Sequence, residues 1–104
     1  MTDIRDSALE PHLETRLNGQ TAKIRWHELQ RYFARGVVRE VAPGEDLVAV
    51  GKAIIDNDTE RVRQWLASQV LTVPDDARAR RWHADDAELW ALVVAPWVLV
   101  QRGQ

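Results

Sequence analysis

The chain has 104 residues, of which 45% are hydrophobic and 29% are charged, with 16 acidic side chains, 14 basic side chains and no cysteine. This size and balance predict one globular domain, and the net charge of −2 argues against a strongly basic nucleic-acid-binding protein. The absence of cysteine excludes disulfides, thiolate metal sites and thiol nucleophiles. We therefore expect residues 1–104 to form a single compact domain, with frayed ends at residues 1–6 and 102–104.

The sequence contains no segment typical of secretion or of a membrane span. Its first residues are polar, and the longest apolar stretch, Leu89–Val100, has 12 residues and is interrupted by Pro96. A membrane-spanning helix needs about 20 apolar residues, and a secretory signal combines a basic start with an apolar stretch. We expect a cytoplasmic protein that has no membrane partner.

Apolar residues at helical spacing predict about five helices. The clearest helix carries its apolar side chains at i, i+4, i+7 and i+11, namely Ala22, Trp26, Leu29 and Phe33. Ile24 does not fit this stripe, so we place the start of this helix nearer Arg25 than Thr21. Gly36 follows its end. Three further helices are predicted at residues 7–17, 46–55 and 75–83. Another begins near residue 57, and we expect its Val62, Trp65 and Leu66 side chains to face inward.

Capping residues mark the starts of three of these helices. Asp46 can cap the helix that runs to Ile55, and Asp75 or Asp76 can cap the one that runs through His83. Asn57-Asp58-Thr59-Glu60 has the Asn-x-x-Glu form of a capping box. Gly51 lies inside the helix at 46–55, where it is a weak point unless another element packs closely against it.

Runs of β-branched residues predict three strand regions, Val37–Val41, Val70–Val73 and Leu89–Val100, of which the last is one strand or a pair. Pro96 predicts a bulge or an edge position in the last region. The fold class expected is therefore α+β, with about five helices packed on a small sheet of three or four short strands. Residues 33–38 also resemble residues 66–71, which is consistent either with a duplication or with two copies of a common helix–turn–strand pattern.

Most catalytic motifs are missing. The five glycines are scattered singly, which argues against a phosphate-binding loop, and neither Ser7 nor Ser68 has the glycine neighbours of a nucleophile turn. Asp56–Glu60 begins like a calcium loop, but Arg61 and Ala67 stand where glycine and glutamate are required, so we interpret the segment as a helix cap. We expect no catalytic residue, no metal and no cofactor.

Two groups of arginines and two tryptophans are the candidate contact residues. Arginine outnumbers lysine by 12 to 2, and the candidates are Arg31, Arg35 and Arg39, Arg78, Arg80 and Arg81, and Trp82 and Trp90. Guanidinium groups suit phosphate and base edges, and tryptophan is favoured at binding hot spots. Acidic blocks flank both arginine groups, however, and Trp26 and Trp65 fall on apolar helix faces, where core packing explains them.

The sequence also resembles a known family. The segments that carry the likeness are Thr21-Ala22-Lys23-Ile24-x-Trp26-x-Glu28-Leu29, Phe33-Ala34-x-Gly36, Asp46-Leu47-Val48, Trp65, Trp82 and Ala95-Pro96-Trp97-Val98-Leu99-Val100-Gln101. Together they are similar to a family of small bacterial proteins, domain of unknown function 2288, from about Leu13 to Gln101. The resemblance implies a single compact domain in the bacterial cytoplasm, and it implies no catalytic residue. We expect the segment Ala95–Gln101 to be structural, since it contains no nucleophile, acid or base.

Three functions remain open at this stage. The preferred one is a non-catalytic cytoplasmic protein-interaction domain that binds a protein partner or associates with itself. The alternative is a nucleic-acid-associated protein that uses the arginine clusters. The third is a small metal-dependent or acid/base enzyme, for which His83, Asp85, Asp86 and Glu88 are the nearest set of ligands.

Overall fold

The computed structural model describes residues 21–103. In chain order the elements are β1 (Ala22–Arg25), α3 (Trp26–Ala34), β2 (Val38–Val41), α4 (Leu47–Ile55), α5 (Thr59–Ser68), β3 (Leu71–Thr72), α6 (Asp76–Ala84), β4 (Glu88–Val94) and β5 (Trp97–Arg102). The α+β class is confirmed, but the described residues hold four helices and five strands instead of about five helices and three or four strands. The helix expected at residues 7–17 lies outside the described residues.

The five strands form one mixed sheet in the order β1-β4-β5-β2-β3. β2 and β5 pair in parallel, with Val38 opposite Val98, and all other neighbours are antiparallel. β4 and β5 form a hairpin in which Leu92 lies opposite Leu99. β5 runs through Arg102, which pairs with Leu89, so the strand extends into the end that we expected to be frayed.

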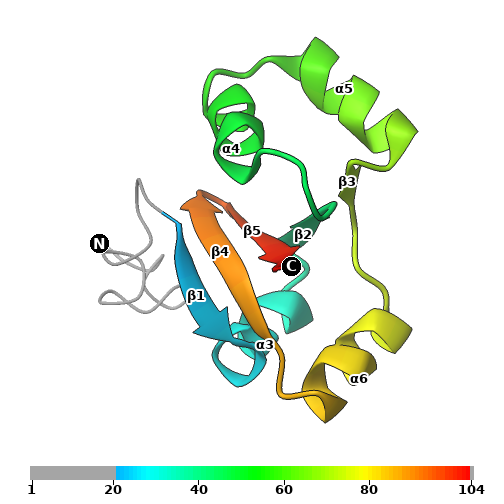
Figure 1. The fold of residues 1–104 in the computed structure, drawn as a ribbon. Helices are drawn as coiled ribbons and strands as arrows, with labels where there is room; N and C mark the ends of the chain where they lie inside the picture. Colours follow the sequence, from blue (N-terminus) through cyan, green and yellow to red (C-terminus); the bar gives the residue numbers. More distant parts are fainter. Residues whose placement is uncertain (1–20, 104) are drawn as a thin grey trace.

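Helices cover both faces of this sheet, with α4 and α5 on one side and α3 and α6 on the other (Figure 1). Side chains alternate along each strand, so β5 sends Val98 and Val100 to the α3–α6 side and Leu99 to the α4–α5 side. Two separate hydrophobic cores result, one under each pair of helices. Burial on both faces explains why Leu89–Val100 is almost continuously apolar.

The predicted helix start near Arg25 is confirmed, since α3 begins at Trp26 with Arg25 as its N-cap residue, but the strand before it was not predicted. Residues 22–25 form β1 and not helix, and Ile24, which did not fit the helical stripe, is buried and pairs with Leu89. α3 begins directly after the strand, where the Trp26 N–H donates to the Ala87 carbonyl at 2.8 Å. Trp26, Leu29 and Tyr32 then fill the core on this side.

The predicted helix caps are confirmed in two of three cases. Asp46 and Asp75 accept hydrogen bonds from the backbone N–H groups of Ala49 and Arg78. The third helix, α5, is capped by Asp58 and not by Asn57. Asn57 has a φ of 59°, because it closes the end of α4 in the left-handed conformation that asparagine tolerates.

Gly51 and Pro96 show how the α4 face and the β4–β5 hairpin are built. A Cβ on Gly51 would lie 2.7 Å from Leu92 Cδ2 and 3.2 Å from Val94 Cγ1, so glycine lets α4 approach β4 closely, as the sequence suggested. Pro96 occupies neither a bulge nor an edge. It follows a cis peptide bond in the turn between β4 and β5, where no ladder hydrogen bond is required of its nitrogen.

Candidate binding pocket between α4 and α5

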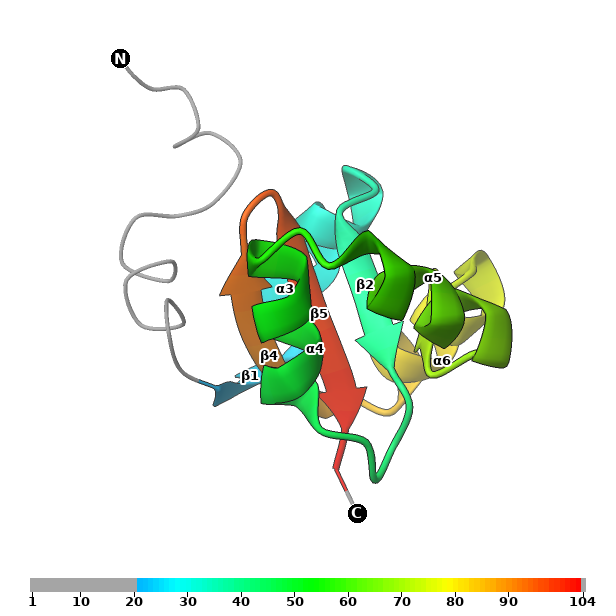
Figure 2. The ribbon, with the colours of Figure 1, turned by 90° about the horizontal axis from the view of Figure 1, so that it is seen from above.

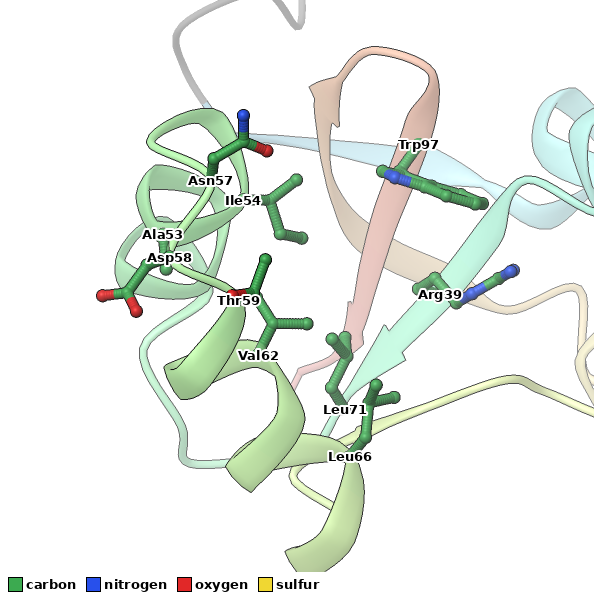
Figure 3. Close-up of a pocket in the computed structure, with 10 residues that line it drawn as sticks. All are labelled: Arg39, Ala53, Ile54, Asn57, Asp58, Thr59, Val62, Leu66, Leu71 and Trp97. Carbon is green, nitrogen blue, oxygen red and sulfur yellow. The ribbon is translucent and has the colours of Figure 1, made fainter.

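The sheet face that α4 and α5 cover is left partly open between the two helices. α4 packs on β4 and β5 (Figure 2), whereas α5 lies toward β3 at the edge of the sheet (Figure 1). A pocket of about 340 Å³ lies between them (Figure 3), lined by Arg39, Ala53, Ile54, Asn57, Asp58, Thr59, Val62, Leu66, Leu71 and Trp97. Its volume and mainly apolar lining are those of a ligand-binding site.

Apolar side chains of the two helices form the walls of the pocket. α4 provides Ala53 and Ile54 from its last turns, and α5 provides Val62 and Leu66, which lie one helical turn apart. α5 has no fully buried side chain, and Leu66 is 46% exposed. The apolar side of α5 that faces the pocket is therefore only partly covered by the rest of the described protein.

The turn between α4 and α5 supplies polar groups at the rim. Asp58 is already engaged, because its carboxylate accepts the Arg61 N–H at 3.2 Å and caps α5. Asn57 lies at the same end of the pocket as Trp97 (Figure 3). Its side-chain amide makes no hydrogen bond within residues 21–103 and can act there as both donor and acceptor.

Arg39 and Trp97 form one end of the floor, and Leu71 lies beside them. The guanidinium carbon of Arg39 lies 4.4 Å from the centroid of the Trp97 ring, which is a cation–π contact. The Arg39 Nη1 donates to the carbonyls of Gly36 and Val38 at 3.0 and 2.9 Å. No carboxylate within residues 21–103 pairs with Arg39. Burial lowers the pKa of Arg39, since partial desolvation disfavours the charged form.

The three arginines expected to form one basic face are divided by the sheet. Arg31 lies on α3 and Arg35 follows its end, and both are exposed. Arg39 points to the opposite face, because side chains alternate along β2 and its neighbour Val38 packs under α3. The prediction of a single Arg31, Arg35 and Arg39 surface is therefore wrong.

The second arginine group is partly engaged within the fold. Arg78 binds both carboxylate oxygens of Glu40, and its guanidinium carbon lies 5.4 Å from the Trp82 ring centroid. The hydrogen bond to Glu40 raises the pKa of Arg78 above its usual value. Arg80 and Arg81 are exposed on α6, so only these two of the group remain as candidate surface contacts.

The two candidate tryptophans have different environments. Trp82 is fully buried, with its ring centroid 5.0 Å from that of Trp26, so the prediction that it forms a contact surface is wrong. The physical reason is that Trp82 is the one buried side chain of α6 and holds this helix against α3. Trp90 is 36% exposed on the opposite face of the sheet, where the Lys23 ammonium lies 5.0 Å from its ring.

Two of the residues nearest to a metal-binding set, His83 and Asp86, line one small pocket with His27, but both aspartates of the set are engaged in ion pairs. Asp86 binds Arg25, and Asp85 lies 3.8 Å from Arg102. His83 is exposed at the end of α6. Within residues 21–103 no group of three or more histidine, aspartate and glutamate side chains is arranged to hold a metal ion, and no helix of that range is long and apolar enough to cross a bilayer.

Among the residues that line the pocket, only Arg39 was a predicted contact residue, and Trp97 was assigned to a purely structural segment. Val98, Leu99 and Val100 are buried as expected for a structural segment, but Trp97 is half-buried and lines the pocket. Alternation along β5 could have placed Trp97 on the same face as Leu99. The position of α5 on the sheet leaves Trp97 partly exposed, and no local sequence pattern predicts that position.

Comparison with known proteins agrees with the resemblance seen in the sequence. The family model described as protein of unknown function, DUF2288, matches residues 12–102. The chain belongs to this family. The chain is also similar to a solved structure, the NMR solution structure of PA1075 from Pseudomonas aeruginosa. The two share 37% sequence identity with a TM-score of 0.75, over 97% of this chain and 93% of that chain. No curated protein is significantly similar to this DUF2288 chain.

Proposed function

We propose that this DUF2288 chain is a non-catalytic protein-interaction domain of the bacterial cytoplasm, and that the pocket between α4 and α5 is its contact site. The observation that carries the proposal is an apolar pocket of about 340 Å³ that stays open beside the partly exposed Leu66. Such pockets receive the anchor side chains that dominate protein–protein binding energy. One apolar side chain of a partner would cover Val62 and Leu66 and complete the packing of α5.

The chemistry of the lining supports binding more than catalysis. Asp58 is occupied as a helix cap, and the Thr59 hydroxyl has no histidine or free carboxylate beside it among the lining residues. A hydroxyl nucleophile needs such a base. The polar groups that do line the pocket, Arg39, Asn57 and the Trp97 N–H, are suited to orienting a bound group.

Self-association through Trp90 is the second form of the same proposal. Trp90 and Lys23 lie on neighbouring strands of the sheet face that also carries α4, and a partly exposed tryptophan is a favourable anchor for a second copy. Light scattering over a range of concentrations tests this form, because a dimer that Trp90→Ala weakens would support it.

Two matched variants test the pocket. Leu66→Arg places a charge at the rim, and Ile55→Arg makes the same change at another exposed residue, 69% accessible, that does not line the pocket. Peptides selected from a random library on the wild-type protein should lose binding to Leu66→Arg and keep binding to Ile55→Arg. Failure to recover any binding peptide, or equal behaviour of the two variants, would overturn the proposal.

A further inference from the structure

Arg39 is a partly buried cation whose protein partners leave part of its binding capacity unused. Of its five N–H donors, those on Nη1 bond to the carbonyls of Gly36 and Val38. Nε and Nη2 have no acceptor within residues 21–103, and no carboxylate in that range forms an ion pair with this side chain. A cation removed from water is stabilised most by a hydrogen-bonded anion, so an anionic ligand suits this end of the pocket.

A second donor lies beside Arg39. Figure 3 shows the Trp97 ring with its Nε1 on the edge toward Ile54. This N–H has no acceptor within residues 21–103. The Arg39 guanidinium carbon lies 4.4 Å from the Trp97 ring centroid, so two neighbouring side chains present N–H groups to the same cavity.

The rest of the cavity has the opposite character. Ile54, Val62 and Leu66 are apolar, and they line the same cavity of about 340 Å³ as Arg39. A ligand that fits both parts must carry an apolar group and an anionic group close together. The C-terminal residue of a protein has this form, because its side chain and its free carboxylate are attached to one Cα atom.

We infer that the pocket binds an apolar C-terminal residue of a partner protein, with the side chain between α4 and α5 and the carboxylate on Arg39. This inference rests on the proposed function and adds which part of the partner is recognised. Capture of a terminal carboxylate by clustered N–H donors is an established mode of peptide recognition. Arg39 is the anchor, since its planar fork can bind both carboxylate oxygens.

The test compares two small probes that differ in one group. N-acetyl-leucine carries the carboxylate and N-acetyl-leucinamide replaces it with a neutral amide. Each is titrated into the ¹⁵N-labelled full chain, with the Trp97 indole signal and the backbone signals of Ile54 and Leu66 as reporters. Ligands this small bind in about the millimolar range. We expect both probes to shift these signals, and the acid to bind about tenfold more tightly than the amide.

Variants then locate the effect. Arg39→Gln should make the two affinities equal, whereas Arg80→Gln, which removes an exposed charge from α6 on the other face of the sheet, should leave the tenfold difference unchanged. Equal binding of acid and amide to the wild-type chain would overturn the C-terminal inference and leave the proposed pocket intact. No shift with either probe would overturn both. Tighter binding of N-acetyl-leucyl-aspartyl-amide than of N-acetyl-leucine would also overturn the inference, because it would identify an internal acidic side chain as the anion.

Discussion

Glu40 on β2 and Arg78 on α6 form a bidentate ion pair. Arg78 Nε donates to Glu40 Oε1 at 3.1 Å, and Arg78 Nη2 donates to Glu40 Oε2 at 2.5 Å. The Glu40 side chain is 8% exposed and that of Arg78 is 38% exposed. The carboxylate therefore lies inside the protein and depends on a guanidinium that reaches it from the surface, and the pair joins α6 to the sheet.

Replacing Arg78 should destabilise the fold. Arg78→Ala leaves the Glu40 carboxylate buried without its partner, which we expect to cost about 2 kcal/mol, less than for a fully buried pair because Arg78 is partly exposed. Urea denaturation measures the loss. Arg80→Ala is the matched control, since Arg80 is exposed on the same helix and its removal should change stability by less than about 0.5 kcal/mol. Equal stabilities of the two variants would contradict the role of the pair.

Trp82 should be a stability residue and not a binding residue. Trp82→Ala removes a fully buried ring that packs on Trp26, and we expect a loss of about 3–5 kcal/mol in the free energy of unfolding. Trp82→Phe should cost less, because the buried Trp82 Nε1 has no hydrogen-bond partner in the described part of the chain. Trp90→Ala, at a partly exposed ring, is the control. A folded Trp82→Ala variant with wild-type stability would refute this assignment.

Gly51 should not tolerate a larger residue, although alanine is the better helix former by about 1 kcal/mol. The added Cβ would meet Leu92 Cδ2 at 2.7 Å, and we expect Gly51→Ala to destabilise by about 1–3 kcal/mol. Adding Leu92→Ala makes room for the methyl group. The double variant should therefore lose less stability than the sum of the single variants, and simple additivity would show that the contact is not the cause.

Nucleic-acid binding should be weak and sensitive to salt. Arg31, Arg80 and Arg81 are exposed on α3 and α6, and Arg35 is exposed just after α3. The tryptophans under these helices are buried, however, and cannot stack on bases. Fluorescence anisotropy with a labelled oligonucleotide should show binding that disappears between ~0.05 and ~0.15 M salt. Sub-micromolar affinity at the higher salt, lost in the Arg80→Ala/Arg81→Ala variant, would favour the nucleic-acid alternative instead.

Local sequence predicted the elements whose signals are themselves local. Asp46 identified the start of α4, and the valines of β2 and β5 identified strands, because caps and β-branched residues act through neighbouring backbone. β1 was missed because four strand residues run into α3 with no glycine or proline between them. Only the pairing of Ile24 with Leu89, which are distant in sequence, distinguishes this strand from the first turn of a helix.

The similarity between residues 33–38 and 66–71 has a local cause. Gly36 and Gln69 occupy equivalent positions, and both have a positive φ, 79° and 67°, after a helix end. The helices before them, α3 and α5, cover opposite faces of the sheet. Two duplicated helix–strand units would be related by a rotation that exchanges β2 and β3. Because these strands are antiparallel neighbours, that rotation would place both helices on the same face. The common helix–turn–strand pattern explains the similarity without a duplication.

The pocket could not be predicted because no single segment forms it. The sequence grouped Arg39 with Arg31 and Arg35 as one basic stripe, although it also placed Arg39 in a strand. Gly36 ends the helix, and the strand that follows turns Arg39 to the other face, against Trp97. The site thus depends on the pairing of β2 with β5 and on the position at which α5 packs. Both are determined by contacts between parts of the chain that are distant in sequence.

The position of β5 has a consequence for how the protein is made. β5 is the last strand in chain order, yet it lies between β4 and β2 and joins the β1–β4 part of the sheet to the β2–β3 part. As the polypeptide leaves the ribosome, β2 and β3 therefore emerge well before the strand that connects them to β1 and β4. Until then, β2 has an open edge of the kind that other chains can pair with. Co-translational folding of this domain can be completed only when its final strand is free of the exit tunnel.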